Sequence, residues 1–154
     1  MKKLIFYPIL ACLFMATTAS TCSSDDDSSS SSNPAPVINT VTQGTWRVTS
    51  FVEDGNDHTN YFTGYSFTFG SGNALTAINS GTTVSGFWSV TDSDNSDDDS
   101  PHSDLDFNIM FSSPNNFTEL NEDWDILERT DSKIRLRHVS GGDGSIDILT
   151  FEKN

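Results

Sequence analysis

A period-two alternation of apolar and polar residues is the feature that most constrains the fold of this chain. In segment 105–111 (LDFNIMF) every second residue is large and apolar, so an extended backbone has one apolar face and one polar face. Segment 65–69 (YSFTF) alternates in the same way. No window of the sequence sustains the 3.6-residue period of an amphipathic helix. The sequence therefore predicts an all-β fold.

Segments with strand character recur eight times, separated by turns rich in Gly, Asn, Ser and Asp. One or two helical turns are expected at Asn115–Asp123, after Pro114. Eight strands with short antiparallel links favour an eight-stranded up-and-down barrel, because closure removes unpaired edges. A two-sheet sandwich is the alternative. The expected strands are Thr45–Glu53, Tyr65–Phe69, Ala74–Ile78, Thr82–Thr91, Leu105–Phe111, Trp124–Arg129, Lys133–Val139 and Ile146–Phe151.

The N-terminus has the three regions of a secretory signal peptide, which we expect to span residues 1–21. Lys2 and Lys3 are positive, residues 4–15 are almost wholly apolar, and residues 16–21 are small and uncharged. A membrane-spanning helix needs about 20 apolar residues, so this stretch is too short for a permanent anchor of that kind.

Cys22 follows this segment and is the expected site of lipidation. Loss of Cys12 with the signal leaves one cysteine in the exported chain, which excludes an internal disulfide. Ser23, Ser24 and the acidic run at 25–27 then resemble the start of surface lipoproteins from Bacteroidota-type bacteria. The resemblance implies acyl (palmitate) anchoring to the outer membrane, at the cell surface. Cleavage before Cys12, or plain cleavage after Ala19 or Ser20, remains an alternative.

Residues 22–36 form a Ser- and Asp-rich stretch that cannot bury apolar area, and we expect a disordered tether. The folded domain is expected at residues 37–154. The whole chain carries 8 basic and 22 acidic residues, a net charge of −14. Such a charge repels phosphate backbones, so nucleic acid is not an expected partner.

Four segments carry a resemblance to the lipocalin-like lipoproteins of the same bacteria, and more distantly to lipocalins. Gly44-Thr45-Trp46 matches the G-x-W motif, which implies that Trp46 packs across one end of a barrel. Thr130-Asp131 matches two positions of a T-D-Y motif, whereas segment 146–151 lacks the Arg of the last lipocalin strand. Segments 64–69 and 149–153 also match the lipoprotein group. The resemblance implies a lipocalin-like barrel and a location, but no chemistry.

The interior of an eight-stranded barrel holds either side chains or one small ligand. Trp88, Phe107 and Phe67 are the candidates for lining such a cavity. Gly86, beside Trp88 on the same face, and the small residues Ala74 and Ala77 would leave room.

The acidic loop 92–104 is a weak candidate for calcium, through Asp92, Asp94 and Asp97, because calcium takes six to eight oxygen ligands. Its spacing does not fit an EF-hand loop, and a solvated hairpin loop is the stronger interpretation. No other metal site and no cofactor is predicted, because none of the three histidines has a partner at ligand spacing in the sequence.

Two further groups of charged residues are expected to be solvated surface. Lys133, Arg135 and Arg137 alternate with apolar residues, which predicts an outward stripe paired with acids on neighbouring strands. His138 continues the opposite, inward alternation. Paired carboxylates can hydrolyse glycosides, but exposed acids are the stronger interpretation here. The acids concerned are Glu119, Glu122, Asp123 and Asp125.

The sequence has no catalytic motif and predicts a non-enzymatic, monomeric, membrane-anchored lipoprotein. Its first function hypothesis is a barrel that binds a small apolar or amphipathic ligand. The second is a structural or interaction module of the envelope that takes no ligand. A hydrolase is a distant third.

Overall fold

The computed structural model describes residues 33–92, 105–142 and 144–154. Within these ranges one antiparallel sheet contains nine strands in the order β2-β1-β3-β4-β5-β6-β7-β8-β9. Every expected strand is present, and β2 is a two-residue addition. The strands are β1 (Trp46–Glu53), β2 (Asn56–Asp57), β3 (Ser66–Phe69), β4 (Ala74–Asn79), β5 (Thr82–Asp92), β6 (Leu105–Phe111), β7 (Asp123–Arg129), β8 (Lys133–Val139) and β9 (Ile146–Lys153).

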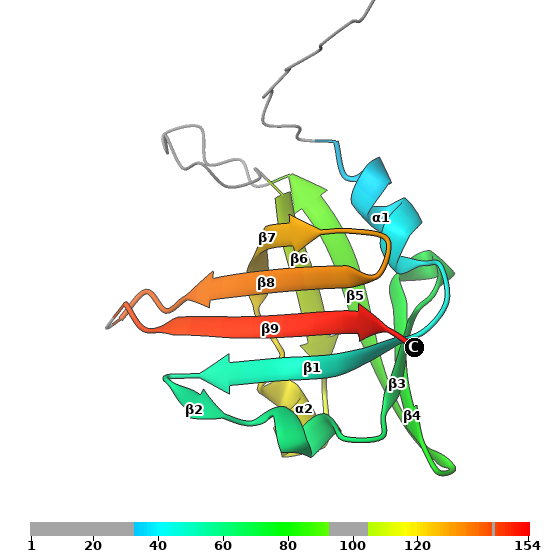
Figure 1. Ribbon diagram of the computed structural model, residues 1–154, viewed down its shortest axis with the longest axis horizontal. Helices are drawn as coiled ribbons and strands as arrows, with labels where there is room; N and C mark the ends of the chain where they lie inside the picture. Colours follow the sequence, from blue (N-terminus) through cyan, green and yellow to red (C-terminus); the bar gives the residue numbers. More distant parts are fainter. Residues whose placement is uncertain (1–32, 93–104, 143) are drawn as a thin grey trace, which may run out of the picture.

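The sheet closes on itself through β1 and β9. These strands pair antiparallel from Trp46↔Lys153 to Val52↔Ile148. On its other side β1 meets β3 at the single pair Trp46↔Phe67. In Figure 1 strands β1, β8 and β9 cross in front of β5 and β6, which run nearly at right angles behind them. The eight-stranded up-and-down barrel, lipocalin-like in topology, is thereby confirmed, and the two-sheet sandwich is excluded.

Large side chains fill the barrel interior. The alternation in β6 behaves as expected, since Leu105, Phe107, Ile109 and Phe111 are all buried. Many of the interior rings meet edge to face, the geometry that aromatic pairs prefer. The largest fully buried side chains are Trp46, Trp124, Phe51, Phe62, Phe67, Phe69, Phe107, Phe111, Phe117, Phe151, Leu75 and Leu120.

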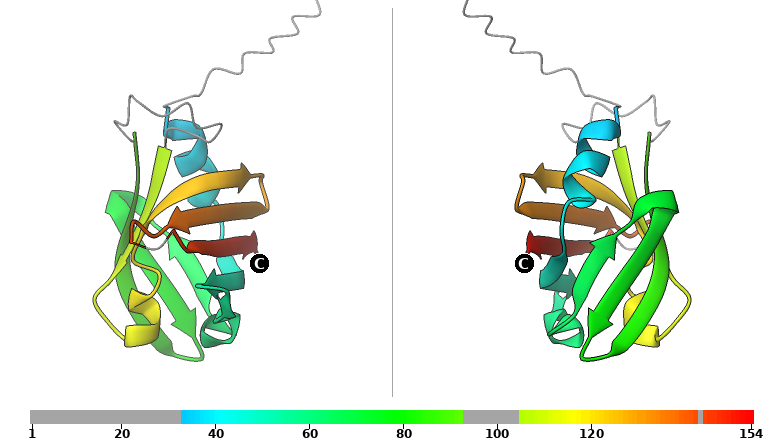
Figure 2. Two further views of the ribbon diagram at one scale, coloured as in Figure 1. Left: turned by 90° about the vertical axis from the view of Figure 1, so that its left-hand side faces the viewer. Right: turned by 90° about the vertical axis from the view of Figure 1, so that its right-hand side faces the viewer.

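Two short helices lie toward opposite ends of the barrel (Figure 2). Helix α2 (Asn115–Thr118) confirms the helical turn expected after Pro114, and it buries Phe117. Helix α1 (Ala35–Val41) was not anticipated from the sequence, and it buries Val37 and Val41. Its first two residues are the last two of the segment expected to be a tether. The 3₁₀ turns η1 (Thr59–Phe62) and η2 (Ser71–Asn73) complete the elements of the described residues.

Each helix is tied to the barrel by a buried tryptophan. Trp46 Nε1 donates to the carbonyl of Val41 at 2.8 Å, and Trp124 Nε1 donates to the carbonyl of Leu120 at 3.1 Å. Both indoles thus satisfy their only donor inside the protein, as a buried tryptophan requires. The helices therefore cover the two ends of the packed interior rather than leaving an open mouth.

Trp46 also brings together the segments that resemble lipocalin motifs. Lys153 Nζ lies 5.4 Å from the centroid of the Trp46 ring and donates to the carbonyl of Asp131 at 3.1 Å. A cation near the face of an indole is attracted by the ring quadrupole. The last strand therefore supplies a cation at this end of the barrel, although segment 146–151 contains no arginine.

Several sequence-based expectations lie outside the described residues. These are the signal peptide at 1–21, lipidation at Cys22, the tether as far as residue 32, and the calcium candidates Asp94 and Asp97. Within the described ranges, no helix has both the length and the apolar character needed to cross a bilayer.

Candidate functional site

A pocket lies on the outer face of the barrel. It has a volume of about 400 Å³ and lies over β5, β6 and the chain leading into β7. Two smaller pockets, of about 260 and 280 Å³, adjoin the residues of α1 and its surroundings. The 400 Å³ pocket, hereafter the outer pocket, falls within the size range of small-molecule sites.

The three residues expected to line an interior cavity do not share one environment. Phe67 and Phe107 are fully buried, and they line none of the three pockets just described. Phe107 packs on Phe69 and Trp88 with ring centroids 5.5 and 5.9 Å apart. Trp88 is 6% exposed and adjoins two of the pockets. Its Nε1 donates to the Gly70 carbonyl at 3.0 Å.

The space expected beside Gly86 is filled. A Cβ atom placed on Gly86 would lie 2.6 Å from Cδ1 of Phe111 and 2.5 Å from the carbonyl oxygen of Met110. Gly86 is therefore the position where the backbone of β5 allows the Phe111 ring of β6 to pack closely, which is a common use of glycine within a strand. The small residue indicates tight packing and not a cavity.

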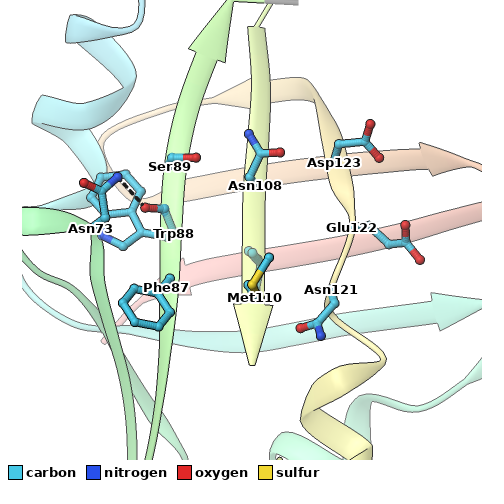
Figure 3. A pocket seen from close by; sticks show the side chains of 10 residues that line it. Asn73, Phe87, Trp88, Ser89, Asn108, Met110, Asn121, Glu122 and Asp123 are labelled. Atoms are coloured by element: carbon cyan, nitrogen blue, oxygen red, sulfur yellow. Dashed lines mark hydrogen bonds between the residues drawn. The ribbon is translucent and has the colours of Figure 1, made fainter. Parts of the chain in front are cut away.

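The outer pocket has an apolar floor made by two neighbouring strands. Phe87 on β5 and Met110 on β6 are Cα partners in the sheet, and they are 63% and 61% exposed. Figure 3 shows Asn73 and Trp88 on one side of this pair and residues 121–123 on the other. The alternation that sends Trp88 and Ile109 inward necessarily turns Phe87 and Met110 outward.

Polar groups surround the apolar floor, and several of them are held in place by the barrel. Asn73 Nδ2 donates to the Trp88 carbonyl at 2.8 Å, the bond drawn as a dashed line in Figure 3. Asn121 forms two bonds with the backbone of Phe111, at 2.6 and 2.8 Å. Asn108 Nδ2 donates to Thr91 Oγ1 at 3.1 Å. The rim is therefore preorganised, which lowers the entropic cost of binding.

The outer pocket is electrically negative. Among the described residues, its lining includes the carboxylates of Glu122 and Asp123 and no basic side chain. Asp106 lies on the same strand face as Asn108, and partial burial together with the charges of Asp123, Asp125 and Asp92 raises its pKa. A site of this kind attracts cations and hydrogen-bond donors and repels anions.

Two histidines each lie close to two carboxylates, although their spacing in the sequence did not predict this. Ligand atoms of Glu53, His58 and Glu119 lie within 4.8 Å of one another. Those of Glu122, Asp123 and His138 do so as well. No sequence signal could have found the first group, because Glu119 follows α2 whereas the other two residues flank the β1–β2 hairpin.

Glu53 lies in an unfavourable setting for a carboxylate. Its pKa is raised, first by burial and then by the negative charges of Glu119 and Asp147, while His58 acts in the opposite direction. The carboxylates of Glu53 and Glu119 thus lie beside one imidazole, and a positive charge placed between them would relieve their repulsion.

The other acids of segment 119–125 lie close to His138 or Arg137. Glu122 Oε2 is 3.5 Å from His138 Nε2, and Asp125 Oδ2 is 2.7 Å from Arg137. The side chain of His138 is 18% exposed and lies near the Trp124 ring, at 6.2 Å between centroids. Glu122 and Asp123 thus share His138, whereas Asp125 pairs with Arg137, and these contacts fit the interpretation of the acids as charged surface.

Two of the three residues in the basic stripe of β8 pair with acids of β7, as its alternation predicted, and the third, Arg135, is exposed. Lys133 Nζ lies 2.8 Å from Glu128, and Arg137 binds Asp125 through two nitrogens. Arg129, just before this strand, donates to Thr40 Oγ1 of α1 at 3.0 Å. Lys133, Arg137 and Arg129 are therefore engaged in contacts within the fold, which weakens the case for an anionic ligand at this stripe.

No family model, curated protein or solved structure matches this chain.

Proposed function

We propose that this protein is a lipid-anchored envelope module that binds a small amphipathic molecule on the outside of its barrel. The observation that carries the proposal is the filled interior, capped by α1 and α2, beside an outer pocket of about 400 Å³. This modifies the first hypothesis from the sequence, which placed the ligand inside. The second hypothesis, a module that takes no ligand, is the alternative that the experiments below address.

The ligand class follows from the lining of the outer pocket. Phe87 and Met110 offer exposed apolar area for a ring or a short chain. Glu122 and Asp123 offer acceptors and negative charge at the edge of that area. The complementary molecule has an apolar face and an amine, so a cationic amphiphile should bind better than a neutral one, and an anionic one worst.

A matched set of small probes tests this proposal. Phenethylamine, phenethyl alcohol and phenylacetate share a ring and differ in charge. Titration of the protein, followed by NMR, should give the highest affinity for the amine and the lowest for the acid. Phe87→Ala should weaken binding of the amine about tenfold, equivalent to about 1.4 kcal/mol.

Ile146→Ala is the matched control, because Ile146 is also exposed, at 52%, but lies on β9. It should leave the affinities unchanged. Equal affinity for all three probes, or amine binding that survives Phe87→Ala, would reject the outer pocket as the site. If none of the probes binds, the ligand-free interaction module becomes the better account.

Anchoring has its own test at Cys22. Cys22→Ala should move the protein from the membrane fraction to the soluble fraction and abolish incorporation of labelled palmitate, because stable attachment requires the acyl chains. Cys12→Ala is the control and should leave both readouts unchanged. Palmitate incorporation that persists in Cys22→Ala would show that the lipid is attached elsewhere.

A further inference from the structure

A tight hairpin positions Glu53 and His58. Asp54 and Gly55 have φ angles of 49° and 77°, so a two-residue turn with positive φ reverses the chain between β1 and β2. The amide of Asp54 donates to Oδ1 of the buried Asp147 at 3.0 Å, which ties the turn to β9. The end of β1 is therefore held on both sides.

The ring of His58 is fixed by its neighbours. It lies against Phe51 and Tyr61, with centroids 6.0 and 5.1 Å away. The amide of His58 donates to the Phe51 carbonyl at 2.8 Å, and its carbonyl accepts from the Tyr61 amide at 3.0 Å. Both the backbone and the ring of His58 are thus held in place by the fold. A binding site needs side chains fixed in this way, with their ligand atoms in a defined orientation.

Glu119 approaches His58 from a different part of the fold, the end of helix α2. It is the C-terminal capping residue of α2. Phe117 of that helix is fully buried and packs on Phe62 of η1 at 5.3 Å, edge to face. The contact between the helix and η1 therefore fixes the distance between Glu119 and the hairpin.

The facing atoms of His58 and Glu119 have no hydrogen bond. His58 Nδ1 and Glu119 Oε2 are each buried as atoms, and they are 3.7 Å apart, beyond hydrogen-bond reach. Buried polar atoms without a partner are rare and require an explanation, of which an absent ion is one. Their separation is close to that of two ligands on one metal, since bonds of about 2.1 Å place tetrahedral ligands about 3.4 Å apart.

From this geometry we infer that Glu53, His58 and Glu119 form a binding site for one divalent transition-metal ion, with zinc as the representative. One imidazole nitrogen and two carboxylates are ligands of the type that zinc accepts, and a bound cation satisfies both unpartnered atoms at once. The ion also neutralises the repulsion between Glu53 and Glu119. A three-residue set leaves a fourth position for water or an external ligand. The site is separate from the outer pocket.

The second histidine cluster provides the internal comparison. His138 Nδ1 already lies 3.2 Å from the carbonyl oxygen of Asp123, and the side chain of Asp123 is 66% exposed. The polar atoms of this second cluster therefore already have partners in the protein or in solvent. We expect the first cluster to bind the ion, and the second to remain a surface interaction.

Zinc titration of the exported protein, released from the membrane in detergent, tests the assignment. Isothermal calorimetry on metal-free protein should show one strong site. His58→Gln and Glu119→Gln should each lower the zinc affinity at least about tenfold. Mutating residues that only hydrogen-bond to a metal ligand already lowers metal affinity by this factor. His138→Gln should leave it unchanged. Circular dichroism of each variant establishes that the barrel is still folded.

A crystal structure with zinc supplies a readout that does not depend on the variants. The anomalous difference map should show a peak within about 2.0–2.2 Å of His58 Nδ1 and of a carboxylate oxygen of Glu53 and Glu119. A peak at His138 in place of His58 would overturn the assignment. The absence of strong binding, or equal affinities in the wild type and in His58→Gln, would do the same and leave His58 and Glu119 as a simple ion pair.

Discussion

Replacement of Phe107 by Ala should destabilise the barrel by about 3–5 kcal/mol, the usual cost of removing a buried phenylalanine from a packed core. Phe107 is fully buried, and its ring contacts those of Phe69 and Trp88. Because no rearrangement of these rings can fill the space that is lost, a cavity will remain. Equilibrium unfolding in urea, followed by tryptophan fluorescence, measures the change.

Met110→Ala is the matched control for this prediction. Met110 lies on the same strand as Phe107 but on the outer face, where it is 61% exposed. Its removal should change the free energy of unfolding by no more than about 0.5 kcal/mol. Similar small effects at both positions would mean that the interior is loosely packed, and would return the ligand to the inside of the barrel.

Gly86→Ala should destabilise the protein by about 1–3 kcal/mol, the range for overpacking a well-filled core. The added methyl group would approach the Met110 carbonyl oxygen to 2.5 Å, and the backbone of β6 cannot move aside as a flexible side chain can. Both strands are expected to separate locally, and the Phe111 ring must shift. Thermal unfolding followed by circular dichroism provides the measurement.

Ser85→Ala tests whether the effect of Gly86→Ala belongs to the site or to the strand. Ser85 precedes Gly86 on β5 and is exposed. A change within about 0.5 kcal/mol is expected there. An unaltered Tm in Gly86→Ala would contradict the packing of Phe111 described above and would mean that this part of the interior has room for a ligand.

The strands were predictable because each one satisfies two rules at once. In β6 the period-two pattern and the burial on one face agree residue by residue, and in β8 the basic residues fall on the opposite face from Ile134 and Leu136. The closed barrel followed from the number of strands and the short links. Helix α1 escaped notice because its seven residues are too few to show a helical period, and because a Ser- and Asp-rich stretch precedes it.

The candidate sites were less predictable, since they depend on contacts between distant segments. The outer pocket is formed by residues that the alternation correctly turns outward, but their grouping depends on the register between β5 and β6. The cluster at His58 depends on how α2 packs against η1. The spacing of residues along the sequence does not predict such contacts. The role of Gly86 was misjudged because a missing side chain can mark either open space or a close neighbour.

The pairing of β1 with β9 determines when the barrel can form during synthesis. The first and last strands meet along most of their length, and the amide of Asn154 donates to the Thr45 carbonyl at 3.0 Å. Folds dominated by such distant contacts fold slowly, in milliseconds to seconds. Until the final strand has been made, β1 lacks its principal partner and the chain remains open. For the exported, lipid-anchored protein proposed here, this delay would keep the chain unfolded until its last strand has been made.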